Sequence, residues 1–76
     1  GTAYELLRKA EELEKKQQEL LKRQEELAKT AEELRKKGGN ADSMMKIIKE
    51  STRIVRESTE IVKELLKIIR ELRRQS

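Results

Sequence analysis

Pairs of hydroxyl side chains recur in the second half of this chain, and they are the first residues that could do chemistry. Ser51-Thr52 and Ser58-Thr59 stand one seven-residue repeat apart. A serine or threonine becomes a nucleophile only when a base beside it takes its proton. The chain has no His and no Cys, and its acidic residues fall outside the apolar positions of the repeat. We therefore expect no enzyme active site and no small-molecule substrate.

Paired glutamates such as Glu11-Glu12 and Glu25-Glu26 could suggest a metal site. A metal site inside a helical bundle usually combines inward-facing glutamates with a Glu-x-x-His motif, which this sequence lacks. The glutamates instead belong to a regular polar face, since Glu recurs at every seventh residue: Glu5, Glu12, Glu19, Glu26 and Glu33. We expect no metal and no other cofactor.

The hydroxyl pairs have a different use if they are buried, because they stand where the repeat elsewhere supplies Leu or Met. Gln17 and Gln24 likewise interrupt a row of alanines in the first half. A buried polar group without a partner costs about 1 to 3 kcal/mol, so partners are expected. The candidate buried polar network consists of Gln17, Gln24, Thr30, Ser51, Thr52, Ser58 and Thr59.

Two interpretations of these polar residues compete. In the first, they form hydrogen-bond layers that fix the register and the number of chains in an assembly. In the second, each hydroxyl bonds the carbonyl four residues back, and the glutamines reach solvent at the edge of the seam. We favour the first because the polar residues recur at matching spacing. Which hydroxyl each glutamine reaches, and in which chain, stays open.

Two helices must position these residues. The chain is interrupted only at Gly38-Gly39-Asn40, which predicts a first helix over about 3–37, a loop over about 38–40 and a second helix over about 41–74. Thr2 and Glu5 have the spacing of a capping box, and Asn40 is the favoured N-cap of the second helix, with Asp42 as the alternative. So short a loop predicts an antiparallel, all-α hairpin. That hairpin sets Gln24 near Val55, and Gln17 near Val62.

The two predicted helices carry apolar faces of different width. The first has a narrow face, with Leu at every seventh residue: Leu6, Leu13, Leu20, Leu27 and Leu34. The second uses four of every seven positions, which is too wide for one narrow neighbour to cover. The residues expected at a contact between copies of the chain are Ile47, Ile48, Ile54, Val55, Ile61, Val62, Leu65, Ile68, Ile69 and Leu72.

Such a face predicts self-assembly, since a soluble monomer rarely exposes an apolar patch of more than a few hundred Å². The seven-residue repeat favours a parallel copy of the second helix as partner. The second helices would then form an inner ring, with the first helices outside. A wide inner face beside a narrow outer face favours a homotrimer over a tetramer or a dimer.

The charge pattern and the short apolar runs argue against nucleic-acid and membrane partners. The 19 basic and 15 acidic residues alternate along the chain and give a net charge of +4. Arg70, Arg73 and Arg74 make a small basic end, but a helix dipole explains it and no aromatic residue is there to stack on bases. We expect no nucleic-acid partner, and no membrane partner either, since no apolar run approaches the roughly 20 residues of a span. The absence of cysteine leaves the cellular compartment open.

The uniform rows, the Gly1-Thr2 start, the wholly polar surface and the interior Ser, Thr and Gln residues together resemble a known class of proteins. They are similar to de novo designed helical-hairpin homo-oligomers with buried hydrogen-bond networks. The resemblance covers the whole chain and implies a cyclic dimer, trimer or tetramer of concentric helices that acts as a structural scaffold. The alternative is a natural coiled-coil adaptor that binds a partner helix, and a basic nucleic-acid-binding module is a weaker third.

Overall fold

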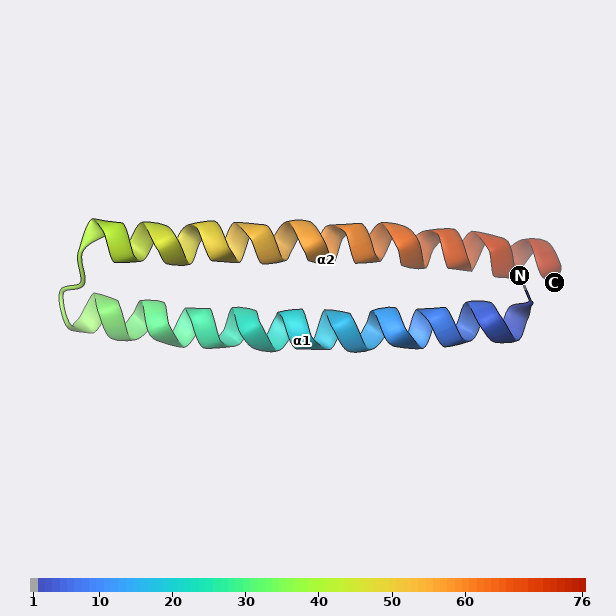
Figure 1. Cartoon of the computed structure of the whole chain (residues 1–76), viewed down its shortest axis with the longest axis horizontal. Helices are drawn as coiled ribbons and strands as arrows, with labels where there is room; N and C mark the ends of the chain where they lie inside the picture. The colour runs from blue at the N-terminus through green and yellow to red at the C-terminus, as the bar shows by residue number, and fades with distance from the viewer. Residues whose placement is uncertain (1) are drawn as a thin grey trace.

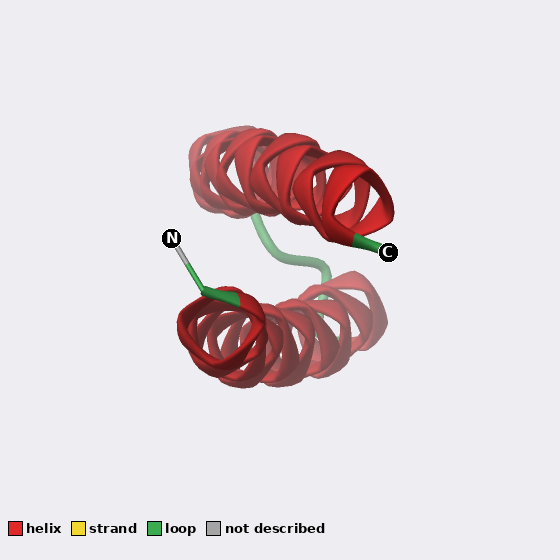
Figure 2. Ribbon diagram, turned by 90° about the vertical axis from the view of Figure 1, so that its right-hand side faces the viewer, coloured by secondary structure: helices red, strands yellow, loops and turns green. Residues whose placement is uncertain are grey.

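The chain folds into two long antiparallel helices joined by one short loop (Figure 1). The computed structural model describes residues 2–76, so Gly1 lies outside the described part. Helix α1 spans Ala3–Lys36 and helix α2 spans Ala41–Gln75, so both helices begin at the predicted residue and each ends within one residue of the predicted end. The start of α1 and the end of α2 lie at one end of the hairpin and the loop at the other (Figure 2). The predicted all-α hairpin is confirmed.

The first turn of α1 is held by the predicted capping box. The Thr2 hydroxyl accepts a hydrogen bond from the Glu5 amide at 3.2 Å, and the Glu5 carboxylate accepts from the Thr2 amide at 3.4 Å. The Thr2 hydroxyl also donates to that carboxylate at 3.0 Å. These hydrogen bonds lower the pKa of Glu5, chiefly through the Thr2 side chain. A charged Glu5 therefore favours this helix end.

The reversal between the helices depends on Gly38, which has a φ of +71°. This left-handed conformation suits glycine because it has no Cβ. It lets the Gly38 amide donate to the Arg35 carbonyl, and the Gly39 amide donate to the Leu34 carbonyl at 2.7 Å, so the end of α1 is closed. The Asn40 side chain then accepts from the Ser43 amide at 2.8 Å, which confirms Asn40 as the N-cap of α2.

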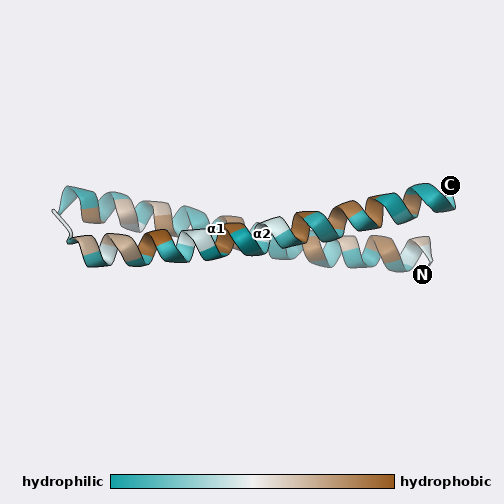
Figure 3. Cartoon of the chain, turned by 90° about the horizontal axis from the view of Figure 1, so that it is seen from above, coloured by the Kyte–Doolittle hydropathy of each residue, from teal (hydrophilic) through white to brown (hydrophobic). Residues whose placement is uncertain are grey.

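The core of the single hairpin is a thin seam between the helices. Its buried members are Leu27, Ile54, Ile61 and Ile68. Three of the four come from one row of α2, because the residues at every seventh position point directly at α1. Viewed from above, hydrophobic brown segments recur along α2 (Figure 3). One seam this thin leaves a second apolar row of α2 about half exposed.

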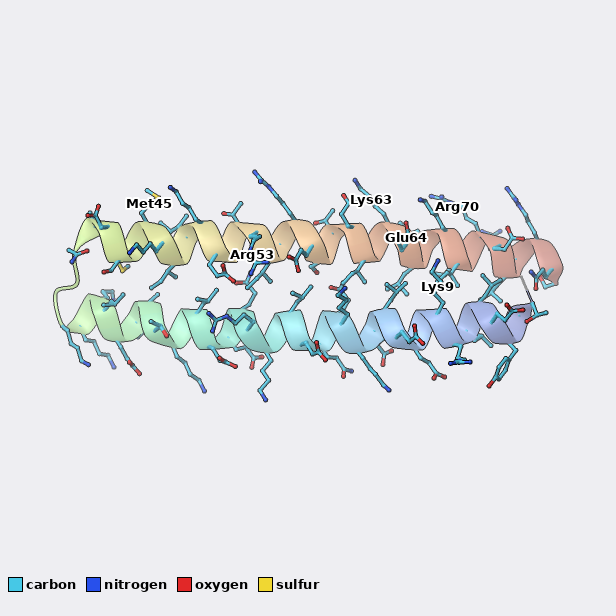
Figure 4. The ribbon with its side chains drawn as sticks, in the orientation of Figure 1. Lys9, Met45, Arg53, Lys63, Glu64 and Arg70 are labelled. Atoms are coloured by element: carbon cyan, nitrogen blue, oxygen red, sulfur yellow. The ribbon has the colours of Figure 1, made fainter. Side chains whose placement is uncertain are left out.

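Charged residues line one flank of the seam. Glu50 accepts hydrogen bonds from Arg53 of the same helix, and Arg53 also pairs with Glu57 at 2.6 Å. The pKa of Glu50 is lowered, first by the hydrogen bond from Arg53 and then by the charges of Arg53 and Arg23, which lies on α1. Lys9 of α1 and Glu64 of α2 also lie at the seam, whereas Lys63 and Arg70 extend outward (Figure 4). Within residues 2–76, neither helix has a stretch long and apolar enough to cross a membrane.

Candidate self-association surface

A second apolar row of α2 lies beside the buried one and is left half exposed. We call it the exposed row, and its side chains are 45 to 54% exposed: Ile48, Val55, Val62 and Ile69. Each follows a seam residue by one position, which turns it about 100° around the helix, away from α1. Glu50 lies three positions after Ile47, on the opposite side of the seam row. The hairpin therefore has one charged flank and one apolar flank.

The apolar flank is hollowed into a groove between the helices. Its volume is about 410 Å³, and both helices line it: Gln17, Leu20, Leu21 and Gln24 from α1, and Ile54, Val55, Ser58, Thr59 and Val62 from α2. The groove thus brings together both glutamines, one hydroxyl pair and two members of the exposed row. The predicted closeness of Gln24 to Val55, and of Gln17 to Val62, agrees with this lining.

The two glutamines tie α1 to the backbone of α2. The Gln17 side-chain amide donates to the Ser58 carbonyl, and the Gln24 side-chain amide donates to the Ser51 carbonyl, each at 3.3 Å. Both bonds therefore end on main-chain oxygens, not on hydroxyls. They occur one repeat apart on each helix, so they form two similar layers across the seam.

The threonines of the predicted network bond locally within the hairpin. The hydroxyls of Thr30, Thr52 and Thr59 donate to the carbonyls of the residues four positions earlier, at 2.8 to 3.0 Å. Within a single chain, this agrees with the second interpretation of the threonines. The glutamines fit neither interpretation fully, since they neither reach a hydroxyl nor point only into solvent. No hydrogen bond within the chain links Thr30 to Ser51 or Thr52 among the described residues.

Several residues expected between copies of the chain lie inside the hairpin. Ile54 is 2% exposed, and Ile61 and Ile68 are also buried, because they pack against α1 of the same chain. Ile47, Leu65 and Leu72 are half-buried at its edge. The exposed row is left as the part of that predicted set that faces away from the hairpin.

Other large apolar residues extend this surface beyond the predicted set. Leu21 on α1 and Met45 and Leu66 on α2 are each close to or more than half exposed. Met45 and Leu66 share a row with Thr52 and Thr59, on the edge of the stripe far from α1. The position of Met45 and Leu66 in the heptad pattern is the sequence feature that could have predicted their place on this surface.

The hairpin exposes far more area than a folded monomer of its mass. Its accessible surface is 6322 Å², whereas a compact monomer of 8.9 kDa exposes about 4800 Å². Its radius of gyration is 17.2 Å, compared with about 11 Å for a compact chain of this length. The excess of about 1500 Å² follows from the elongated shape of two helices that pack along a single seam.

The chain has no match among protein-family models, characterised proteins or solved structures.

Proposed function

We propose that this chain is a structural, self-assembling scaffold of the designed helical-hairpin type, whose most favoured assembly is a cyclic homotrimer. The observation that carries the proposal is the exposed row, which continues along most of α2 beside the row that holds the buried Ile54, Ile61 and Ile68. Half-exposed Ile and Val over that length cost free energy in water, at roughly 25 cal/mol for each Å² of apolar surface.

A second copy of the same chain is the occupant that fits this row best. The row keeps a seven-residue period, so a parallel α2 can follow it in a left-handed supercoil without losing contact. No charged residue interrupts the row, and the charged flank with Arg23 and Glu50 lies on the other side of the seam. The copies would therefore meet through α2, with their charged flanks in water.

The different widths of the apolar faces of α1 and α2 favour an assembly of three copies. In a dimer of hairpins all four helices surround one core, so each helix needs an apolar face of similar width. Here α2 has exposed apolar residues on two rows, whereas α1 adds only isolated ones such as Leu7 and Leu21. An inner ring of α2 helices covered by α1 helices would bury both the wide apolar face of α2 and the narrow apolar face of α1.

Solution mass tests the proposal. A trimer has three times the chain mass of 8.9 kDa, about 26.7 kDa, which light scattering after size exclusion and native mass spectrometry both resolve. A monomer at micromolar concentration would contradict self-assembly, and a coiled-coil adaptor with a different partner would then explain the exposed row. A dimer or a tetramer would contradict only the number of chains.

A further inference from the structure

Two charged rows of opposite sign border the apolar flank of the hairpin. On α2, a basic residue directly follows each residue of the exposed row, and we call this set the basic row: Lys49, Arg56, Lys63 and Arg70. On α1, Glu25 directly follows Gln24 at the edge of the groove. Its row contains glutamates but no Lys or Arg, and we call it the acidic row: Tyr4, Glu11, Gln18, Glu25 and Glu32. All members of both rows are exposed.

The charged flank shows that rows of opposite sign meet across the seam of this hairpin. There the positive charge of Arg23 on α1 acts on Glu50 of α2. Lys9 of α1 and Glu64 of α2 lie at the same seam, two repeats further along (Figure 4). The signs are reversed on the apolar flank, where α1 is acidic and α2 is basic. No helix of the same chain covers that flank among the described residues, so its charged rows face outward.

The charges that border the apolar flank are little used within the hairpin. Among residues 2–76, neither Glu11 nor Glu25 makes an ion pair, and Lys49 makes none either. Lys63 pairs with Glu60 of its own helix at 3.2 Å, but both side chains are more than half exposed. An ion pair this exposed is weak, so these rows keep their charges available for a partner.

The position of the apolar rows places α1 of one copy beside α2 of the next. The exposed row lies about 100° around α2 from the seam row, and the other apolar rows lie on this same side. The axis of a ring of α2 helices therefore lies on this side, and the next α2 lies against the apolar flank, within reach of α1. Leu7 of α1 and Leu66 on α2 of the next copy, 52% and 44% exposed in the hairpin, would then cover each other.

The glutamine bonds give the relative heights of the residues on the two helices. Gln17 bonds the carbonyl of Ser58, and Gln24 bonds that of Ser51, so the two residue numbers add to 75 in both bonds. Residues of α1 and α2 whose numbers add to 75 are therefore level. Rotation about the axis of a ring moves no residue along that axis, so the same rule holds between α1 of one copy and α2 of the next.

We infer that the acidic row of each α1 packs against the basic row of the next copy, with Glu25 opposite Lys49 and Glu11 opposite Lys63. In each of these pairs the residue numbers add to 74, which is an offset of one residue rise, about 1.5 Å. The inference rests on the proposed self-assembly with parallel α2 helices. It adds the contact that decides which flank of a hairpin faces its neighbour, because burial of apolar surface is non-directional whereas charged rows attract in one orientation and repel in the other.

Glu11→Lys with Glu25→Lys tests this contact, because it places like charges where opposite charges would meet. We expect the dissociation constant, measured by sedimentation equilibrium at low salt, to rise at least about tenfold over that of the parent. Salt of about 0.5 M should reduce this difference, since it screens exposed charges. Adding Lys49→Glu and Lys63→Glu reverses both rows, and this row-reversed variant should return to within about threefold of the parent.

The matched control combines Glu11→Lys and Glu25→Lys with Lys15→Glu and Lys29→Glu. It has the net charge of the parent and of the row-reversed variant, and it keeps opposite charges four positions apart on α1, but it leaves the basic row unchanged. Its dissociation constant should therefore stay high, while circular dichroism shows intact helices in every variant.

Three results would overturn the inference while leaving self-assembly intact. They are an unchanged dissociation constant after Glu11→Lys with Glu25→Lys, recovery in the matched control, and no recovery in the row-reversed variant. A parent chain that is monomeric throughout would instead contradict the proposed function, and this inference with it.

Discussion

Two glutamates in the exposed row should dissociate the assembly without unfolding the hairpin seam. We consider the double variant Val55→Glu and Val62→Glu. The two valines are 53% and 45% exposed in the single hairpin, so longer polar side chains there can reach water when the chain is alone. Both residues line the groove, so in the proposed assembly the new carboxylates would be buried against a neighbour.

The expected loss follows from these exposures. Full burial of a valine side chain is worth about 1.5 to 3 kcal/mol, so completing the burial of each half-covered valine contributes about 1 kcal/mol. Removing an unpaired carboxylate from water costs several kcal/mol more. For two sites the sum is about 5 kcal/mol or more in each chain, which corresponds to more than a thousandfold in the dissociation constant.

Light scattering and native mass spectrometry measure the outcome, with circular dichroism to report helicity. We expect a mass of one chain at concentrations where the parent is assembled. Gln18→Glu with Ala41→Glu is the control, since both residues are exposed and the change in net charge is the same. Unchanged mass and helicity in the Val55, Val62 variant would mean that the exposed row faces water, and the heptad argument for assembly would be refuted.

Three further predictions concern the seam, the loop and the first helix end. The double variant Ile54→Glu, Ile61→Glu should lose both helicity, measured by circular dichroism, and assembly, measured by solution mass, because these two side chains are buried within the hairpin itself. A folded monomer would contradict the burial of these two residues in the hairpin. Gly38→Ala should lower the free energy of unfolding in urea by about 1 kcal/mol through its left-handed φ of +71°, and an unchanged midpoint would show that the turn does not need glycine. Thr2→Ala should raise the pKa of Glu5 toward its ordinary value in an NMR titration. Because the pKa of Glu5 is lowered in the folded chain, the capping interaction stabilises α1 at a pH above the unfolded pKa, and this stabilisation is lost as the pH falls through the folded pKa. Identical titrations of parent and variant would contradict the hydrogen bond.

The polar layers should control specificity more than stability. A variant with apolar residues at every network position except Thr30 should stay helical and should melt at the same or a higher temperature than the parent. The reason is that satisfied buried polar groups add little net stability compared with well-packed apolar side chains. It should also populate several assembly sizes in native mass spectrometry, since slipped registers would no longer leave a polar group unpaired. A single species with the parent mass would show that these residues do not set the number of chains. The positions changed are Gln17, Gln24, Ser51, Thr52, Ser58 and Thr59.

Local order in this chain could be predicted from the sequence alone. The helices, their caps at Thr2 and Asn40 and the turn at Gly38 follow from interactions between residues at most five positions apart, which a sequence displays directly. The short loop also made the antiparallel hairpin predictable. The seven-residue rows made the two apolar faces predictable, because residues at that spacing share one side of a helix. The rows also predict that the hairpin leaves apolar area exposed, because the apolar face of the second helix is wider than that of the first.

Only the tertiary structure decided how the apolar rows are divided. The pattern put Ile54 and Val55 in one face, but the angle at which α1 packs buries the first and leaves the second half exposed. It also decided the polar contacts: Gln17 and Gln24 bond the carbonyls of Ser58 and Ser51, and only Gln17 keeps a buried acceptor without a donor. These outcomes depend on the rotation and offset of one helix against the other, which are set by side-chain packing between residues far apart in sequence, and a heptad pattern fixes neither to within a hydrogen-bond length.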